Sequence, residues 1–147
     1  MPRRRVLTDA QITALFALPT AEADLIRHYT LRPDDLAVIA RRRRPHNRLG
    51  FALQLCALRY PGRLIRPGEL VPLEIVTFVA EQLDIDPDAL SDYATRAPTR
   101  YDHLDALRDA FGFRTFSQPD HRELSAWLMP IALATVSAIA VAEALMA

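Results

Sequence analysis

The chain has 147 residues, half of them apolar and about a quarter charged, which is the composition of an ordinary globular domain. A chain of this length buries enough surface to fold without disulfides, and its one cysteine, Cys56, is expected to be a buried thiol in a reducing cytoplasm. The formal net charge is zero, but residues 1–66 hold 13 Arg and five acids, whereas residues 67–147 hold five Arg and 13 acids. We therefore expect a basic half (1–66) and an acidic half (67–147) packed on it. A mutual attraction of the two halves is the alternative reason for this asymmetry.

The first 45 residues predict three short helices joined by turns. Thr8 is a candidate N-cap for the first helix, and Thr20 for the second. Pro33, with acidic residues beside it, suits the first turn of a third helix. That helix is predicted to end in the arginine run Arg41 to Arg44, before Pro45.

A fourth helix is predicted from about His46 to Tyr60. Its apolar residues cover most of the circumference, which is typical of a buried, central helix. Gly50 lies inside it at a cost of about 1 kcal/mol relative to alanine, and close packing against a neighbour would explain its presence.

The acidic half follows a loop rich in proline and glycine, "YPGRLIRPGELVP". The pattern then predicts helices over 73–83, 88–96 and 99–111, and another that starts near Asp120 and carries Trp127. Pro130 should kink or end that helix. Because no strand pattern longer than a few residues occurs, the predicted fold is all-α, a compact multi-helix bundle.

The segment Ala126 to Ala142 carries no charge. Its small residues and Pro130 make it a poor membrane span, so we expect a helix that is buried or covered by a partner, and no membrane contact. Self-association through Leu128 to Met146 is one way to cover it. The pattern also stops without a cap, which indicates a chain truncated at its C-terminus.

No motif for catalysis or metal binding emerges. A nucleophile elbow and a phosphate-binding glycine loop are both absent from the sequence. In "YDHLD" only Asp102 and Asp105 would share a helix face, so a solvated acidic helix is expected around His103. The run "DIDPD" lacks the glycine and glutamate of a calcium loop. We therefore predict no catalytic residue, no metal ligand and no cofactor.

The basic half has the spacing of a helix-turn-helix, with a helix before the arginines and another after Pro45. Asn47 and Arg48 would then read base edges, with His46 beside them. The predicted phosphate contacts come from the other arginines of this half: Arg41, Arg42, Arg43, Arg44, Arg59, Arg63 and Arg66, with Arg3, Arg4 and Arg5 as a minor-groove arm. Two alternatives remain open: Asn47 could cap the helix start, and the arginine run could be a solvated helix end.

Two segments carry a resemblance to a known family: "LIRHYTLRPDDL" at residues 25–36 and "HNRLGFALQLCALRYPGR" at residues 46–63. They resemble the N-terminal region of Tn3-family transposases, and so do "FVAEQLDIDPDALSDYA" and "TRYDHLDALRDAFGFRTF" further on. The resemblance implies a helical module that binds the terminal inverted repeats of a transposon, while catalysis belongs to a later domain with an Asp-Asp-Glu metal site. Because family members are several times longer, this chain would be an excised domain or the remnant of a truncated gene.

The sequence thus predicts an all-α module that binds double-stranded DNA in the bacterial cytoplasm, with no activity of its own. The alternative is a protein-interaction module that uses the acidic half and the apolar C-terminal helix. A steep dependence of DNA affinity on salt would favour the first hypothesis.

Overall fold

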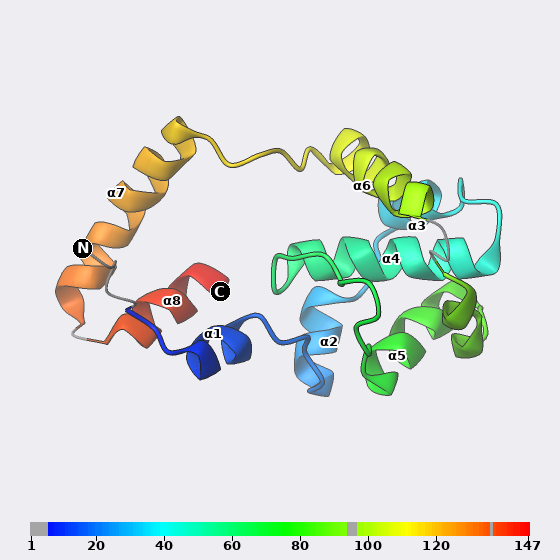
Figure 1. Ribbon diagram of the computed structural model, residues 1–147, viewed down its shortest axis with the longest axis horizontal. Coiled ribbons are helices and arrows are strands. Elements are labelled where there is room, and N and C mark those ends of the chain that lie inside the picture. The colour runs from blue at the N-terminus through cyan, green and yellow to red at the C-terminus, as the bar shows by residue number, and fades with distance from the viewer. Residues whose placement is uncertain (1–5, 94–96, 136) are drawn as a thin grey trace. The chain divides into compact units, whose positions relative to one another are not determined.

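The computed structural model describes residues 6–93, 97–135 and 137–147 of the chain. In this part of the chain every regular element is a helix, which confirms the all-α prediction (Figure 1). The chain forms two compact units: residues 18–113 make the larger, and residues 1–17 with 114–147 the smaller. The predicted halves follow charge along the sequence, whereas these units follow contacts, so the two divisions describe different properties.

The larger unit is built around one helix, α4 (Pro45–Arg59), which contacts α3, α5 and η1. Its remaining elements are α2 (Glu22–His28), α3 (Pro33–Ile39), α5 (Leu73–Leu83), the 3₁₀ helix η1 (Pro87–Asp92) and α6 (Ala97–Phe111). Every residue of α4 from Leu49 to Ala57 is buried, which confirms the prediction of a central helix. Tyr29, which directly follows α2, also belongs to the core, as do Ile75 of α5 and Leu107 of α6.

Polar side chains tie the loops of the larger unit to its helices. Gln82 of α5 accepts a hydrogen bond from the Leu31 amide at 2.8 Å and donates one to the Tyr29 carbonyl at 2.9 Å. Gln54 of α4 accepts from the Ile65 amide at 2.9 Å and donates to its carbonyl at 3.3 Å. Because each glutamine satisfies buried backbone groups, both loops keep fixed positions on the core.

Close packing at Gly50 is also confirmed. A Cβ placed there would lie 2.0 to 2.2 Å from ring atoms of Tyr93, a separation that no real contact shows. The glycine therefore lets the Tyr93 ring lie directly on the backbone of α4, and the contact explains the helix-weakening residue.

Several helix ends differ from the predictions. The N-cap of α2 is Ala21, without a side-chain hydrogen bond, and not Thr20. The predicted helix over 88–96 is the 3₁₀ helix η1, and residues 94–96 lie outside the described residues. The third helix, α3, already ends at Ile39, so the arginine run follows it as a connection to α4. Arg44 is extended because a residue that precedes proline avoids the helical region, and Pro45 then begins α4.

The smaller unit holds α1 (Asp9–Leu15), α7 (Gln118–Ala134) and α8 (Ala138–Met146). Thr8 caps α1 through a capping box with Gln11, as predicted. α7 continues through Pro130, and no described residue of these three helices is buried. The described residues of the apolar segment are therefore not buried by this chain, and its coverage by a partner stays a prediction. Among the described residues, no helix is long and apolar enough to cross a membrane.

Candidate nucleic-acid interface

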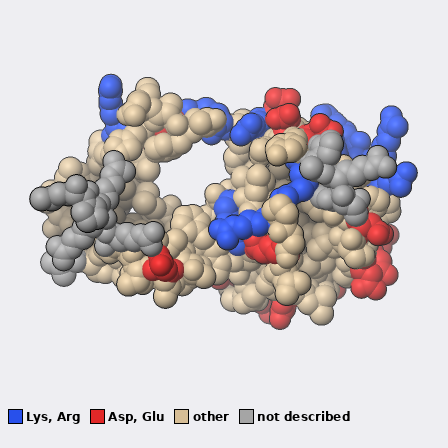
Figure 2. Space-filling view, in the orientation of Figure 1, with Lys and Arg blue, Asp and Glu red and all other residues tan. Residues whose placement is uncertain are grey.

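Residues 40–44, which we name the arginine link, join α3 to α4 and carry the arginine run. Arg41, Arg43 and Arg44 are exposed, and Figure 2 shows basic side chains gathered at this edge of the larger unit. None of the three takes part in an ion pair with another described residue. Their positive charge is therefore available to a ligand.

Arg42, in contrast, anchors the link to the core. Its guanidinium carbon lies 5.0 Å from the centroid of the Phe51 ring, within the range of a cation–π contact. Its Nε atom is buried and has no hydrogen-bond partner in the part of the chain that the structure describes. The backbone adds two hydrogen bonds, from the Arg41 amide to the Val38 carbonyl at 3.2 Å and from the Arg42 amide to the Ile39 carbonyl at 3.0 Å.

Arg48 turns back onto the same link. Its Nε donates a hydrogen bond to the Arg42 carbonyl at 2.8 Å, and its Nη2 donates a longer one to the Ala40 carbonyl at 3.5 Å. These carbonyls follow the end of α3 and would otherwise need another donor. The side chain predicted to read bases is thus engaged in shaping the link.

An open depression, which we name the link depression, lies between the arginine link and the start of α6. The arginines of the link and Asn47 form one side, and Thr99, Asp102 and His103 of α6 form the other. Asn47 is half-buried, while Asp102 is exposed. His46 is half-buried and does not line the depression. Of the predicted base-reading residues, Asn47 is therefore the one that lines this surface.

The contribution of α6 was missed by the sequence analysis. His103 is only 4% exposed, so the expectation of a fully solvated helix around it is wrong. Its ring meets the Phe51 ring edge-on, and its Nδ1 lies 2.9 Å from the Tyr93 hydroxyl. Desolvation by burial, reinforced by the charge of Arg42, lowers the pKa of His103 to about 4. The imidazole is therefore neutral near pH 7, and with its proton on Nε2 the Nδ1 atom accepts a hydrogen bond from the Tyr93 hydroxyl.

Two predicted phosphate contacts are instead occupied by carboxylates. Arg59 pairs with Asp35 through two hydrogen bonds of 2.8 Å, and its guanidinium carbon lies 5.1 Å from the centroid of the Phe111 ring. Arg63 pairs with Glu69 at 2.8 and 2.9 Å. Both guanidinium groups stabilise the fold, because two parallel hydrogen bonds hold each of them in place.

The remaining predicted arginines differ in position. The Arg66 side chain is exposed. The backbone amide of Arg66 donates a hydrogen bond to the Glu69 carboxylate at 3.2 Å. Arg3, Arg4 and Arg5 lie outside the described residues, so the minor-groove arm stays a prediction.

Comparison with known proteins identifies the family to which this chain belongs. The family model described as "Domain of unknown function (DUF4158)" matches residues 6–147. The transposase for transposon Tn21 from Escherichia coli is 42% identical over 145 residues, which are 99% of this chain and 15% of the relative. The transposase for transposon Tn501 from Pseudomonas aeruginosa is 40% identical over 92% of this chain and 14% of the relative.

A third relative, the transposase for transposon Tn1546 from Enterococcus faecium, is 35% identical over 92% of this chain and 14% of its own length. The chain thus spans about 15% of the length of the first of these relatives, at the N-terminal region of Tn3-family transposases. These matches confirm the resemblance drawn from the sequence. The 147 residues do not include the catalytic domain of a transposase.

Proposed function

Because this chain belongs to the DUF4158 family and matches the N-terminal region of Tn3-family transposases, we propose that it is a DNA-binding module for transposon terminal inverted repeats. The observation that carries the proposal is the arginine link. Three exposed arginines without a carboxylate partner among the described residues border a depression at the start of the central helix. Such a surface suits a duplex backbone, whose phosphates dominate affinity.

In this proposal the arginines of the link and Arg48 have two different roles. Arg41, Arg43 and Arg44 contact phosphates, which fixes the orientation of the module but carries no sequence information. Arg42 and Arg48 hold the link in shape through the Phe51 ring and the link carbonyls. Asn47 reads a base edge, since its amide can pair bidentately with adenine in the major groove.

The phosphate contacts are tested with Arg43→Ala and Arg44→Ala. Each should weaken binding to every duplex and reduce the slope of log affinity against log salt by ~1. The matched control is Arg27→Ala, which removes another exposed arginine, one that lies in α2 outside the link depression. An unchanged salt slope in both link variants, or an equal change in the control, would refute the proposed interface.

The reading of bases is tested with Asn47→Ala. This change should cost ~1–3 kcal/mol on a terminal inverted repeat and leave the affinity for a shuffled duplex of equal length almost unchanged. Equal losses on both duplexes would make Asn47 a backbone contact. No change on either would remove this residue from the interface.

A second candidate function rests on the smaller unit. Trp127, Met129 and Leu133 of α7 are 53, 56 and 81% exposed, and an apolar surface of this kind favours a protein partner. We propose that it mediates self-association of the module, in addition to DNA binding. DNA binding of this kind would act at the nucleoid in the bacterial cytoplasm, and we include this location in the proposal.

A further inference from the structure

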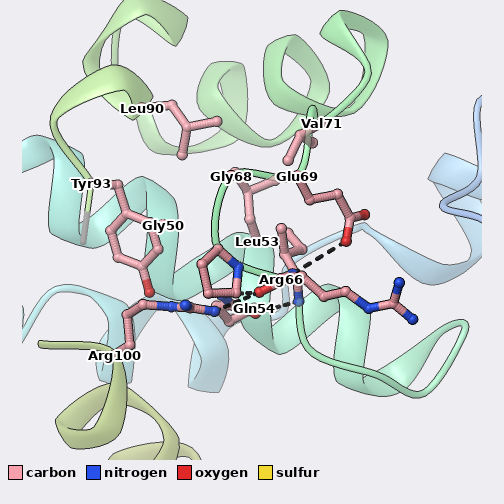
Figure 3. A pocket seen from close by; sticks show the side chains of 12 residues that line it. Gly50, Leu53, Gln54, Arg66, Gly68, Glu69, Val71, Leu90, Tyr93 and Arg100 are labelled. Carbon is pink, nitrogen blue, oxygen red and sulfur yellow. Dashed lines mark hydrogen bonds between the residues drawn. The ribbon is translucent and has the colours of Figure 1, made fainter. Parts of the chain in front are cut away.

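The larger unit holds a second cavity, which we name the Tyr93 pocket. It measures about 210 Å³ and lies between α4 and the loop 65–71 (Figure 3). Leu53, Val71 and Leu90 give it apolar walls, and the ring of Tyr93 forms one side. Since an apolar cavity of about 150 Å³ already accommodates benzene, this volume suits one planar ring system.

The aromatic wall of the pocket is held rigidly. The Tyr93 ring rests on Gly50, where any side chain would overlap with it. The Tyr93 ring is also inclined by 23° to the His103 ring at a centroid distance of 5.5 Å, and its hydroxyl lies 2.9 Å from His103 Nδ1, so His103 holds the hydroxyl end of the ring. A ring fixed in this way offers a stacking surface that loses little conformational freedom when a ligand binds.

The rim of the pocket carries more positive than negative charge. Arg66 is exposed, and Arg100 donates one hydrogen bond to the Ile65 carbonyl at 2.9 Å. Glu69 also lines the pocket, but its carboxylate is already bound by the Arg63 guanidinium. The charge of the rim therefore complements an anionic ligand.

The pocket lies along the same face of α4 as Asn47, which borders the arginine link. Asn47 lines the link depression, and Gly50 and Gln54 line the Tyr93 pocket. Residues spaced by three and four positions lie on one face of a helix, and a rise of 1.5 Å per residue puts the two ends of this row about 10 Å apart. A nucleic-acid strand at the link thus lies within a few nucleotides of the pocket.

We propose that the Tyr93 pocket binds one unpaired nucleobase of a DNA strand, stacked on Tyr93, with the flanking phosphates at Arg66 and Arg100. The inference rests on the proposed function and adds to it a ligand class, DNA with an unstacked base. A stacked base accounts for the aromatic wall and the ring-sized volume, and its flanking phosphates account for the basic rim. Single strands bind in this way to aromatic side chains inside positively charged grooves.

The experiment uses two fluorescent single-stranded oligonucleotides of about 12 nucleotides, a length within the range of single-strand sites. They have equal numbers of phosphates, but one is abasic at its central positions. The unmodified chain should bind the complete oligonucleotide about tenfold more tightly, as one stacked base contributes. Val71→Trp fills the pocket with an indole and should abolish this preference.

The matched control is Leu70→Trp, which adds the same indole one residue earlier, at a position that is 93% exposed and outside the pocket. It should keep the preference. Equal affinities of the unmodified chain for the two oligonucleotides, or a preference that survives in Val71→Trp, would overturn the inference.

NMR of the pocket methyl groups and duplex binding complete the experiment. If Val71→Trp does not fold, the methyl resonances of Val71 and Leu90 in the unmodified chain should shift with the complete oligonucleotide and not with the abasic one. Equal shifts with both would overturn the inference. Duplex binding, measured with the same proteins and with Arg43→Ala, reports on the proposed function separately, because those contacts lie at the link and not in the pocket.

Discussion

At the scale of single residues, the arginines of the basic half differ in what their guanidinium groups contact. Arg59 pairs with Asp35, a carboxylate that is only 2% exposed, and this hydrogen bonding holds the pKa of Asp35 below its usual value. Loss of one partner of a buried pair costs about 3–5 kcal/mol, and the 30% exposure of the Arg59 side chain reduces that cost. We therefore expect Asp35→Asn to lower the free energy of unfolding in urea by about 2–3 kcal/mol.

The matched control for this change is Asp34→Asn. Asp34 lies in the same first turn of α3 but is exposed, so its replacement should cost less than about 1 kcal/mol, chiefly through the helix dipole. Because the pKa of Asp35 is lowered, the pair stabilises the fold above the usual carboxyl pKa and loses this effect as the pH falls through the lowered value. Equal losses in the two variants would show that the ion pair contributes nothing of its own.

His103 gives the second residue-scale prediction. In the folded chain its pKa is lowered to about 4, whereas an unfolded chain protonates histidine near 6.5. Between these values the unfolded state binds more protons, so stability falls as the pH drops from 7 to 4, by about 3 kcal/mol at most. A titration of the His103 ring followed by NMR checks the pKa, and a midpoint near 6.5 would contradict the buried position.

At the scale of elements, the sequence predicts most of the helices but not every helix end. The apolar patterns of α4 and α5 are continuous, so burial decides their extent, and α5 has the predicted bounds 73–83. The end of α3 depends on partners that are distant in sequence, because Arg48 binds carbonyls of the link and Arg42 lies on the Phe51 ring. Local periodicity carries no information about such contacts, so the pattern alone predicts a helix that ends in the arginine run.

The same limit applies to the candidate site. The arginine run and Asn47 are visible in the sequence because charge and residue type mark them. Thr99, Asp102 and His103 come to the link depression only through the packing of α6. Gly50 was the one local signal of this packing, since a glycine inside a helix indicates a close neighbour, but it did not identify Tyr93.

Asp102 leads to a prediction at the scale of the link depression. Its exposed carboxylate faces a surface that we propose for phosphates, where a negative charge opposes binding. Asp102→Asn should therefore increase the affinity for any duplex, by roughly twofold to tenfold at low salt, and the gain should shrink as salt is added. The control is Asp109→Asn, an exposed acid of the same helix outside the depression, for which fluorescence anisotropy should show no such gain. Equal effects of the two changes would place the DNA elsewhere.

At the scale of the whole molecule, charge and packing divide the chain differently. The sign of the charge changes once along the sequence, near residue 66, and this change is readable without a structure. The smaller unit, however, combines residues 1–17 with residues 114–147. A pairing of distant segments depends on tertiary contacts, so composition alone could not predict it.

The smaller unit also differs from the larger one in its core. Within its described residues no side chain is buried, and its apolar residues include the exposed Trp127, Met129 and Leu133. Apolar surface contributes about 25 cal/mol per Å² when it is removed from water, so exposed apolar side chains favour association. We therefore propose that the exposed residues of α7 contribute to self-association of this chain.

We expect the isolated chain to form concentration-dependent oligomers in sedimentation velocity experiments. Leu133→Glu places a charge on the most exposed of these α7 side chains and should shift the equilibrium toward monomer, because burial of an unpaired charge in an interface is costly. Leu70→Glu makes the same change at a 93% exposed leucine of the larger unit and should leave the association unchanged. A monomer at every concentration, or equal shifts in the two variants, would show that the exposed apolar residues of α7 do not bind a second copy. DNA affinity of Leu133→Glu should stay the same at concentrations where both proteins are monomeric, since the arginine link belongs to the other unit.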